Sequence, residues 1–390
     1  MPRSHDLVLF GATGFTGGLT AEYLARHAPA TARWALAGRN LAKLDAVRTR
    51  LAAINPVCAK LPLIEADSGD TASLLQLAES TKAVITTVGP YVHFGEPLVA
   101  ACAAAGTQYA DLTGEPEFVD RMWLKHHETA KQTGARLVHC CGFDSIPHDL
   151  GVYYTVLQLP DDVPIRINAY VSLDAEFSAG TYHSAINAFG RAGQYAGVAM
   201  ERRRREAPLI DRCIGSSPQH LRRHPELGTW VVPFPTIDPQ VVKRSATTLE
   251  RYGPDFRYGH FLQMDTFSQV AKLIGGVSAV AVASQLKPAR NWLLGRKDSG
   301  AGPSEAKRSA SWFRVRFHAV AGDRRLITEV RGGDPGYDET ARMLGESGLS
   351  LAFDRLPKRA GQLTPAAAMG DALLKRLQRS GLIFRTVEPA

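Results

Sequence analysis

The sequence predicts an α/β protein in which a doubly wound parallel sheet is followed by a second α+β domain with a mainly antiparallel sheet. Strand-like apolar runs alternate with helical patterns through residues 1–150, which is typical of a parallel sheet with helices on both faces. Glycines spaced three apart follow the first apolar run, as at a turn from a buried strand into a helix. Later segments such as 166–173 and 312–320 have the alternating character of half-buried antiparallel strands.

The glycine-rich turn follows Phe10, where a short apolar run predicts a buried strand, and it has the spacing G-x-x-G-x-x-G. We expect Gly11 to permit the tight turn, Gly14 to let the backbone approach a diphosphate, and Gly17 to let helix and strand pack closely. Free N–H groups at the helix start would then face an anion. A plain glycine-rich turn is the alternative. The cofactor-binding residues expected here are Gly11, Thr13, Gly14, Phe15, Thr16 and Gly17.

The second predicted strand, 34–37, indicates which dinucleotide is bound. An NAD-preferring site carries an acidic residue at the end of this strand, but residues 33–43 contain none. Arg39 stands there instead, and its guanidinium suits the 2′-phosphate of NADP(H). Asn40 is placed to cap the next helix and to bind the same phosphate, and Lys43 lies one turn further on. The alternative is that Arg39 is an ordinary solvated loop arginine.

Polar and glycine residues also follow three later strands. Asp67 and Ser68 occupy the position where such folds often contact the adenine. Residues 89–91 and 142–145 follow two further strands. Ligands of doubly wound sheets bind at the carboxyl ends of the strands, so this convergence is stronger evidence than any one motif.

Composition limits the class of protein. The chain has 390 residues, enough for about two domains, and its 45% hydrophobic and 22% charged residues are those of a soluble globular protein. The five cysteines are scattered without metal-binding spacing, so we expect no metal and a reducing compartment. The first residues lack the apolar core of a signal peptide, which favours a cytoplasmic location.

The net charge of +8 is compatible with nucleic acid, with an anionic membrane surface, or with an anionic cofactor and substrate. No nucleic-acid-binding motif is present and aromatic residues do not interleave with the basic ones, so we expect no nucleic-acid partner.

The stretch 273–286 contains no charged residue. Its 14 residues fall short of the roughly 18–20 that a spanning helix needs. Two interpretations stay open: a buried helix or dimer core, or a surface within 273–296 that rests on a membrane or covers an acyl chain. In the second, flanking cations would meet lipid phosphates. These cations are Lys272, Lys287, Arg290 and Arg296.

Eight motifs support a family resemblance. They are 11–17, 37–39, 87–91, 111–115, 142–151, 180–181, 302–304 and 363–368. On these residues the chain resembles the saccharopine dehydrogenase-like oxidoreductases, specifically the bacterial branch that includes the trans-acting enoyl reductases of mycobacterial glycolipid synthesis.

The pattern along the chain predicts a Rossmann domain over 1–150, a substrate and dimerisation domain over 151–335, and C-terminal helices over 336–390 that pack back on the first domain. The resemblance implies that the Rossmann domain binds NADP. It implies a homodimer. It also implies that Val88, Gly89, Pro90 and Tyr91 lie near the nicotinamide and that 142–145 line the cleft. No basic pair is placed to bind an amino-dicarboxylic acid, which argues against saccharopine itself.

Three residues are candidates for the proton donor that a reductase needs. Tyr91 is the first, with an aromatic wall against the nicotinamide as the alternative. Asp144 and His148 follow the last strand of the first domain and could form an acid/base pair. Alternatively, Asp144 and Ser145 fix the loop and cap the helix that follows. Glu115 could bind ribose hydroxyls or cap a helix.

The leading hypothesis is an NADPH-dependent reductase of an apolar, acyl-carrier-bound or lipid-linked enoyl or carbonyl substrate, working in the cytoplasm or peripherally at the inner face of the plasma membrane. A dehydrogenase of an amino-acid adduct is the alternative enzyme. A protein that binds NADPH at a lipid surface without turnover is the third possibility.

Overall fold

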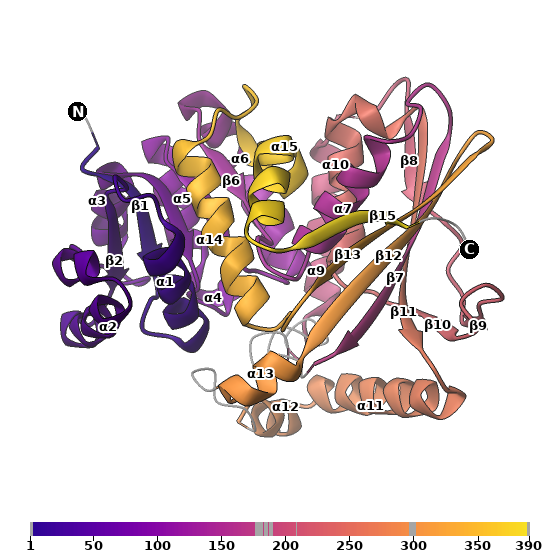
Figure 1. Cartoon of the computed structure of the whole chain (residues 1–390), viewed down its shortest axis with the longest axis horizontal. Coiled ribbons are helices and arrows are strands. Elements are labelled where there is room, and N and C mark those ends of the chain that lie inside the picture. Colours follow the sequence, from indigo (N-terminus) through magenta and orange to yellow (C-terminus); the bar gives the residue numbers. More distant parts are fainter. Residues whose placement is uncertain are drawn as a thin grey trace. The chain divides into compact units, whose positions relative to one another are not determined.

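A computed structural model describes residues 3–175, 182, 186, 190–207, 209–295 and 302–387 (Figure 1). The chain divides into two compact units. The first unit consists of Met1–Phe143, Gly300–Gly302 and Gly336–Ser380. The second unit consists of Asp144–Ser299, Pro303–Pro335 and Gly381–Ala390. The motif at 180–181 lies outside the described residues.

The first unit is built on a seven-stranded sheet with the order β14-β6-β5-β4-β1-β2-β3, and every pairing in it is parallel. This confirms the predicted doubly wound sheet. The strands are β1 (His5–Phe10), β2 (Trp34–Gly38), β3 (Leu63–Glu65), β4 (Thr81–Thr86), β5 (Gln108–Asp111), β6 (Arg136–Val138) and β14 (Gly361–Leu363).

The helices of the first unit connect these strands. They are α1 (Phe15–His27), α2 (Leu41–Ile54), α3 (Thr71–Ser80), α4 (Tyr91–Phe94), α5 (Glu96–Ala105), α6 (Pro116–Thr133), α14 (Asp338–Phe353) and α15 (Pro365–Arg379). Gly106 and Gly134 end α5 and α6 with φ angles of 67° and 83°, the left-handed conformation that glycine adopts without strain. Helix α14 packs against α1, β1, β4 and β5.

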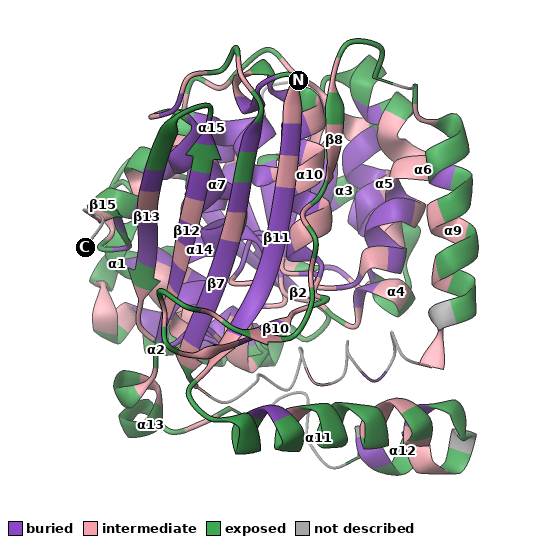
Figure 2. Ribbon diagram, turned by 90° about the vertical axis from the view of Figure 1, so that its right-hand side faces the viewer, coloured by how far each residue is buried: buried purple, intermediate pink, exposed green. Residues whose placement is uncertain are grey.

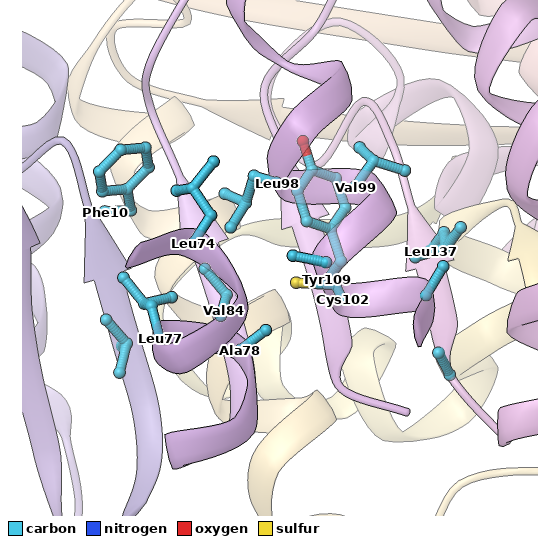
Figure 3. Close-up of a cluster of buried hydrophobic side chains, with 14 of the residues drawn as sticks. Phe10, Leu74, Leu77, Ala78, Val84, Leu98, Val99, Cys102, Tyr109 and Leu137 are labelled. Carbon is cyan, nitrogen blue, oxygen red and sulfur yellow. The ribbon is translucent and has the colours of Figure 1, made fainter. Parts of the chain in front are cut away.

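A hydrophobic core holds this sheet in place (Figure 3). Leucines of α3 and α5 pack with the side chains of the central strands, and all of the labelled residues are buried. They are Phe10, Leu74, Leu77, Ala78, Val84, Leu98, Val99, Cys102, Tyr109 and Leu137. The core fixes the strands from which the loops of the candidate site start.

The second unit is built on an eight-stranded sheet with the order β15-β13-β12-β7-β11-β10-β9, in which β8 also pairs with β11. The pairs β7–β11 and β8–β11 are parallel, and the other pairs are antiparallel. The strands are β7 (Ile165–Asp174), β8 (Cys213–Ser216), β9 (Arg222–Arg223), β10 (Trp230–Pro233), β11 (Asp255–Met264), β12 (Trp312–Ala321), β13 (Arg324–Gly332) and β15 (Ile383–Val387). The predicted class of a parallel α/β sheet followed by an α+β domain is confirmed, with a mixed second sheet.

Helices cover one face of this second sheet, where α7 packs on β12 and β13 and α10 packs on β11. Figure 2 shows the opposite face of this sheet, with β13, β12, β7 and β11 toward the viewer. The helices are α7 (Ile146–Val156), α9 (Ala192–Arg205), α10 (Asp238–Thr248), α11 (Phe267–Gln285), α12 (Lys287–Leu294) and α13 (Glu305–Ala310).

The units do not divide the chain where the sequence-based domains do. The first unit gives way to the second after Phe143, before α7, whereas the expected boundary was residue 150. The C-terminal segment 336–390 is shared: α14, β14 and α15 belong to the first unit, while β15 pairs with β13 in the second sheet.

Candidate functional site

The glycine-rich turn forms a tight strand-to-helix connection. Gly11 has φ +98°, a conformation that favours glycine, and its N–H donates to the carbonyl of Ala37 at 3.0 Å. A Cβ on Gly17 would lie 2.1 Å from the Gly11 carbonyl oxygen, so only glycine fits there. Both glycines have the roles that the spacing predicts for them.

The start of α1 is open for an anion. Its N-cap residue, Gly14, has no side chain to cap the first N–H groups, and the first turn contains no acidic residue. A Cβ at Gly14 would come no nearer to another part of the protein than 3.6 Å, from the Gly11 carbonyl oxygen. Packing within the protein therefore does not require glycine at this position, whereas close approach of a ligand would.

Side chains around the turn are placed in different ways. Thr13 is exposed and Thr16 is half-buried. The ring of Phe15 packs edge-on against Tyr337 with 4.9 Å between centroids, so this side chain has a packing role inside the first unit.

Arg39 follows β2 directly and is exposed. None of the described residues forms an ion pair or a hydrogen bond with its guanidinium. Asn40 caps α2, since its Oδ1 accepts from the N–H of Lys43 at 2.9 Å. The side chain of Lys43 is exposed on the first turn of α2. The end of β2 thus presents one cation, a second cation one turn along, and an amide already used for capping.

Asp67 and Ser68 follow β3. The Oδ1 of Asp67 accepts from the N–H of Gly69 at 2.8 Å, which closes a local turn. Ser68 is half-buried. The carboxylate therefore shapes the loop, and its contact with a nucleotide stays a prediction.

The segment after β4 places Val88 half-buried, Gly89 exposed and Pro90 half-buried ahead of Tyr91. The hydroxyl of Tyr91 donates to the carbonyl of Thr86 at 3.1 Å and accepts from the N–H of Leu112 at 3.2 Å. Burial, followed by the charge of Asp111, raises the pKa of Tyr91 well above its ordinary value. Both hydrogen bonds of this hydroxyl are made to backbone groups inside the first unit, which argues against Tyr91 as the proton donor.

The Tyr91 ring contacts Phe118, with 5.8 Å between the ring centroids. Glu115 binds the backbone next to Tyr91. Its carboxylate accepts from the N–H groups of Tyr91 at 3.1 Å and Val92 at 2.7 Å, so it caps the start of α4. Of the two roles open for Glu115, the structure thus shows the capping one.

In the second unit, His148 is paired with a carboxylate that the sequence did not indicate. Its Nδ1 lies 3.2 Å from Oδ1 of Asp238, the first residue of α10. The Nε2 of His260, on β11, lies 3.5 Å from the other oxygen, Oδ2. All three side chains are buried. Asp238 is thus a carboxylate neighbour of His148 that the sequence did not indicate, while the pairing of Asp144 with His148 stays a prediction.

Hydroxyl groups complete the surroundings of Asp238. Ser145 donates to its Oδ1 at 3.2 Å, and Thr236 donates to its Oδ2. The hydroxyl of Tyr258 lies 3.1 Å from Nδ1 of His260. Because an ionised carboxylate only accepts hydrogen bonds, its charge favours a proton on Nδ1 of His148 and on Nε2 of His260.

Ser145 has φ 115°, a strained conformation for a residue with a side chain. It is the N-cap residue of α7 but makes no side-chain cap. Its hydroxyl goes to Asp238 instead, so the expected capping role of Ser145 is replaced by a link between α7 and α10.

The pKa values of the two carboxyl groups in this cluster, Asp144 and Asp238, shift in opposite directions. Burial, followed by the negative charge of Asp238, raises the pKa of Asp144 to about 7. Burial alone would raise the pKa of Asp238 as well, but attraction to His148 and His260 holds it well below its usual range. One carboxyl thus stays ionised while its half-buried neighbour can carry a proton near neutrality, the division of labour that acid/base sites use.

The same three buried groups could also hold a divalent cation. One ligand atom from each of His148, Asp238 and His260 can be chosen so that all lie within 4.8 Å of one another. The cysteine pattern gave no sign of this cluster. Asp238 and His260 were missed because one begins a helix and the other lies within a strand, about 90 and 110 residues after His148, and no sequence spacing connects them.

Comparison with known protein families finds a match within the first unit. The family model described as the saccharopine dehydrogenase NADP binding domain matches residues 7–138. These residues include most of β1, all of β2 to β6, the glycine-rich turn and Arg39.

Relatives match over the whole chain. It is 40% identical over its full length, and over 99% of the relative, to a Mycobacterium tuberculosis (strain H37Rv) protein whose name places it among the trans-acting enoyl reductases. It is 36% identical to the trans-acting enoyl reductase of Mycobacterium ulcerans (strain Agy99), covering 98% of this chain and 97% of that one. Among solved structures, the saccharopine dehydrogenase (L-Glu forming) of Saccharomyces cerevisiae superposes with a TM-score of 0.57 at 12% identity, covering 98% of this chain and 99% of the other. The last similarity is one of fold alone.

Proposed function

Since the chain belongs to the saccharopine dehydrogenase-like oxidoreductases, whose NADP-binding domain it carries, we propose that it reduces the C=C bond of an enoyl substrate attached to an apolar or lipid-linked chain. NADP(H) is its cofactor. The enoyl substrate is proposed from the names of the relatives that match the chain over 97% or more of both lengths.

The observation that carries the proposal is the pairing of an open helix start with an unpartnered cation at the end of β2. The α1 start offers N–H groups to a diphosphate, and Gly14 leaves room for the diphosphate to approach. Arg39 has no protein partner among the described residues and is free to hold a 2′-phosphate with two parallel hydrogen bonds. These residues fit NADP(H) on their own geometry.

In the proposed reaction, NADPH held by the start of α1 and by Arg39 would supply the hydride that the β-carbon of the substrate needs. The chain supplies the proton that the α-carbon then needs. We assign this proton to Asp144, because burial and Asp238 raise its pKa to about 7. His148, whose Nδ1 lies 3.2 Å from Oδ1 of Asp238, interacts electrostatically with Asp144 and is the positioning residue for it. The double bond is reduced, one hydride and one proton are consumed, and the donor takes its proton back from water.

The test uses purified full-length protein and two measurements. Calorimetry compares NADPH with NADH binding for the native protein and for Arg39→Ala, with Lys60→Ala as the matched control for the loss of one exposed cation. Arg39→Ala should weaken NADPH binding by about ten- to a hundredfold, the effect of a charge-assisted pair, and leave NADH binding nearly unchanged. An equal effect on both nucleotides would remove Arg39 from this role.

Turnover is measured as NADPH oxidation with long-chain enoyl thioesters, ketones and imines. Oxidation with enoyl thioesters alone supports the proposal. Oxidation with imines of amino acids would favour the amino-acid dehydrogenase instead. Tight NADPH binding with no oxidation by any of these compounds would favour a protein without turnover.

We further propose that α11 rests on the cytoplasmic face of a membrane. It is a 19-residue helix, long and apolar enough by length and composition to cross a membrane, yet only 11% of its most apolar window is buried. Its main contacts are with α12, β10 and β11 (Figure 2). The large apolar residues exposed along α11 and α12 are Phe267, Ile274, Val277, Val282, Leu286 and Trp292.

Charge supports contact with a surface rather than a span. Lys272 lies inside α11, and Arg290 on α12 adds a cation that can meet lipid phosphates. Arg296 lies outside the described residues. A homodimer joined through α11 is the competing explanation of the same apolar surface.

Flotation with anionic liposomes and light scattering separate these two explanations. The double variant Ile274→Asp, Val282→Asp should abolish flotation while NADPH affinity stays unchanged, since neither residue belongs to the first unit. Loss of a dimer, with no flotation of the native protein even at low salt, would favour the homodimer.

A further inference from the structure

The open face of the second sheet carries four arginines around one carboxylate. Alternate residues of β12, β13 and β15 point to this face, and the strand register places them side by side. Arg316 lies opposite Glu329, and Glu329 lies opposite Arg385 on the next strand. We call this set the arginine face. Its members are Arg314, Arg316, Glu329, Arg331 and Arg385.

Two of the four arginines form short ion pairs with the Glu329 carboxylate. Arg316 Nε lies 2.8 Å from Oε2 of Glu329, and Arg385 Nη2 lies 2.8 Å from Oε1. The Nε atoms of Arg314 and Arg331 lie further away, at 4.0 and 3.8 Å from the same carboxylate. Four positive charges thus share one negative charge.

Arg314 and Arg331 also face each other directly across β12 and β13. Like charges in directly opposite positions of an antiparallel pair destabilise the sheet. Among the described residues, Glu329 is the only acidic partner of either arginine. The Nε of Arg314 is buried and has no hydrogen-bond partner in the described part of the chain. This pair of guanidinium groups therefore shares its single counter-charge with Arg316 and Arg385.

The four arginines reach solvent, whereas the carboxylate does not. Their side chains are 27% (Arg314), 31% (Arg316), 48% (Arg331) and 50% (Arg385) exposed, and that of Glu329 is 0% exposed. The strands that carry Arg314 and Arg331 face the viewer in Figure 2. A ligand can approach the arginines from solvent.

We propose that the arginine face is a phosphate-binding site in which Arg314 and Arg331 clamp one phosphate group between two adjacent strands. A planar guanidinium donates two parallel hydrogen bonds to phosphate oxygens, and two such forks side by side suit a dianion. The phosphate supplies further negative charge to four arginines that share one carboxylate. The group belongs either to a soluble phosphorylated ligand or to a phospholipid headgroup, because both present the same chemistry.

The experiment titrates full-length protein with inorganic phosphate by calorimetry, in the presence of saturating NADPH so that the nucleotide site is filled. Arg314→Gln and Arg331→Gln are each expected to weaken phosphate binding about tenfold. Arg324→Gln and Arg325→Gln are the matched controls, since these exposed arginines begin β13 and their loss changes the net charge equally. The controls should change the affinity less than twofold.

Glu329→Gln gives a readout of opposite sign. It releases Arg316 and Arg385 from their ion pairs, so phosphate affinity should rise several-fold, and phosphate should raise the melting temperature of this variant more than that of the native protein. A melting curve without phosphate shows whether the variant folds. If it does not, the Arg314 and Arg331 variants with their controls still decide the matter.

Vesicles identify the source of the phosphate. Flotation with phosphatidic acid vesicles, but not with phosphatidylcholine vesicles, that depends on Arg314 and Arg331 supports a lipid headgroup. Binding of inorganic phosphate without such flotation supports a soluble ligand. Absence of both, or equal losses in the Arg324 and Arg325 controls, would overturn the proposal.

Discussion

Gly17 lies against the backbone of Gly11 so closely that a Cβ on Gly17 would be 2.1 Å from the Gly11 carbonyl oxygen. Gly14, between them, has no such neighbour, because its Cβ would be 3.6 Å from the same oxygen. Gly17 and Gly14, two glycines of one motif, are therefore required for different reasons. One is required by the protein fold and the other, on our proposal, by the ligand.

Alanine at each position should separate stability from binding. Gly17→Ala should lower the free energy of unfolding by about 1–3 kcal/mol, since the backbone must shift to admit the methyl group. Gly14→Ala, at φ −78°, should change stability by less than about 0.5 kcal/mol but weaken NADPH binding at least about tenfold. Urea unfolding and calorimetry measure the two effects. Unchanged NADPH affinity in Gly14→Ala would exclude close approach of the diphosphate there.

Tyr91→Phe tests whether this hydroxyl is structural. The substitution leaves the Thr86 carbonyl and the Leu112 N–H without their partner, which should cost about 1–3 kcal/mol of unfolding free energy. Turnover of the folded variant should stay within a few-fold of the native value. A drop of a thousandfold in kcat at unchanged stability would instead restore Tyr91 as the proton donor.

The pH dependence of kcat/KM tests Asp144. Because the donor must carry its proton and its pKa is raised to about 7, the rate should be level at low pH and fall as pH rises through about 7. The Asp144→Asn variant should have a low kcat/KM that does not fall as pH rises through about 7. The same shift makes the folded state bind the proton more tightly, so its contribution to stability is complete below about pH 4 and is lost as pH rises through about 7.

Asp238→Asn tests the positioning of His148. An amide cannot hold both imidazoles as the ionised carboxylate does, so His148 should lose its fixed tautomer. We expect kcat to fall by about ten- to a hundredfold while NADPH affinity is retained. His148→Gln, which leaves Asp238 in place, should lower kcat similarly. Full activity of His148→Gln would contradict any part of His148 in proton delivery.

Local signals in the sequence were enough for β1 to β6 of the first sheet, but not for its edge strand β14, which falls in a segment expected to be helical. A strand followed by glycines, Arg39 at the end of the second strand, and Gly106 and Gly134 at helix ends all act within a few residues, so patterns along the chain reveal them. The uncharged stretch 273–286 likewise belongs to a helix, α11, which ends at Gln285 with Leu286 as its C-cap residue and begins at the capping box of Thr266 and Gln269.

The partner of His148 could not be predicted in this way. Asp238 lies beside it because α7 and α10 pack together, and His260 lies beside Asp238 because α10 also packs on β11. The role of Tyr91 depended on Leu112 and Glu115, which fold beside it from more than 20 residues away. Such contacts follow from tertiary packing, which residue spacing does not encode.

The order of the last strands has a consequence for biosynthesis. β14 completes the edge of the first sheet beside β6, and β15 then completes the edge of the second sheet beside β13. Both strands are translated after residue 360, so each sheet emerges from the ribosome with an unfinished edge. Ribosome-bound nascent chains shorter than this length should consequently expose open β-edges that chaperones recognise.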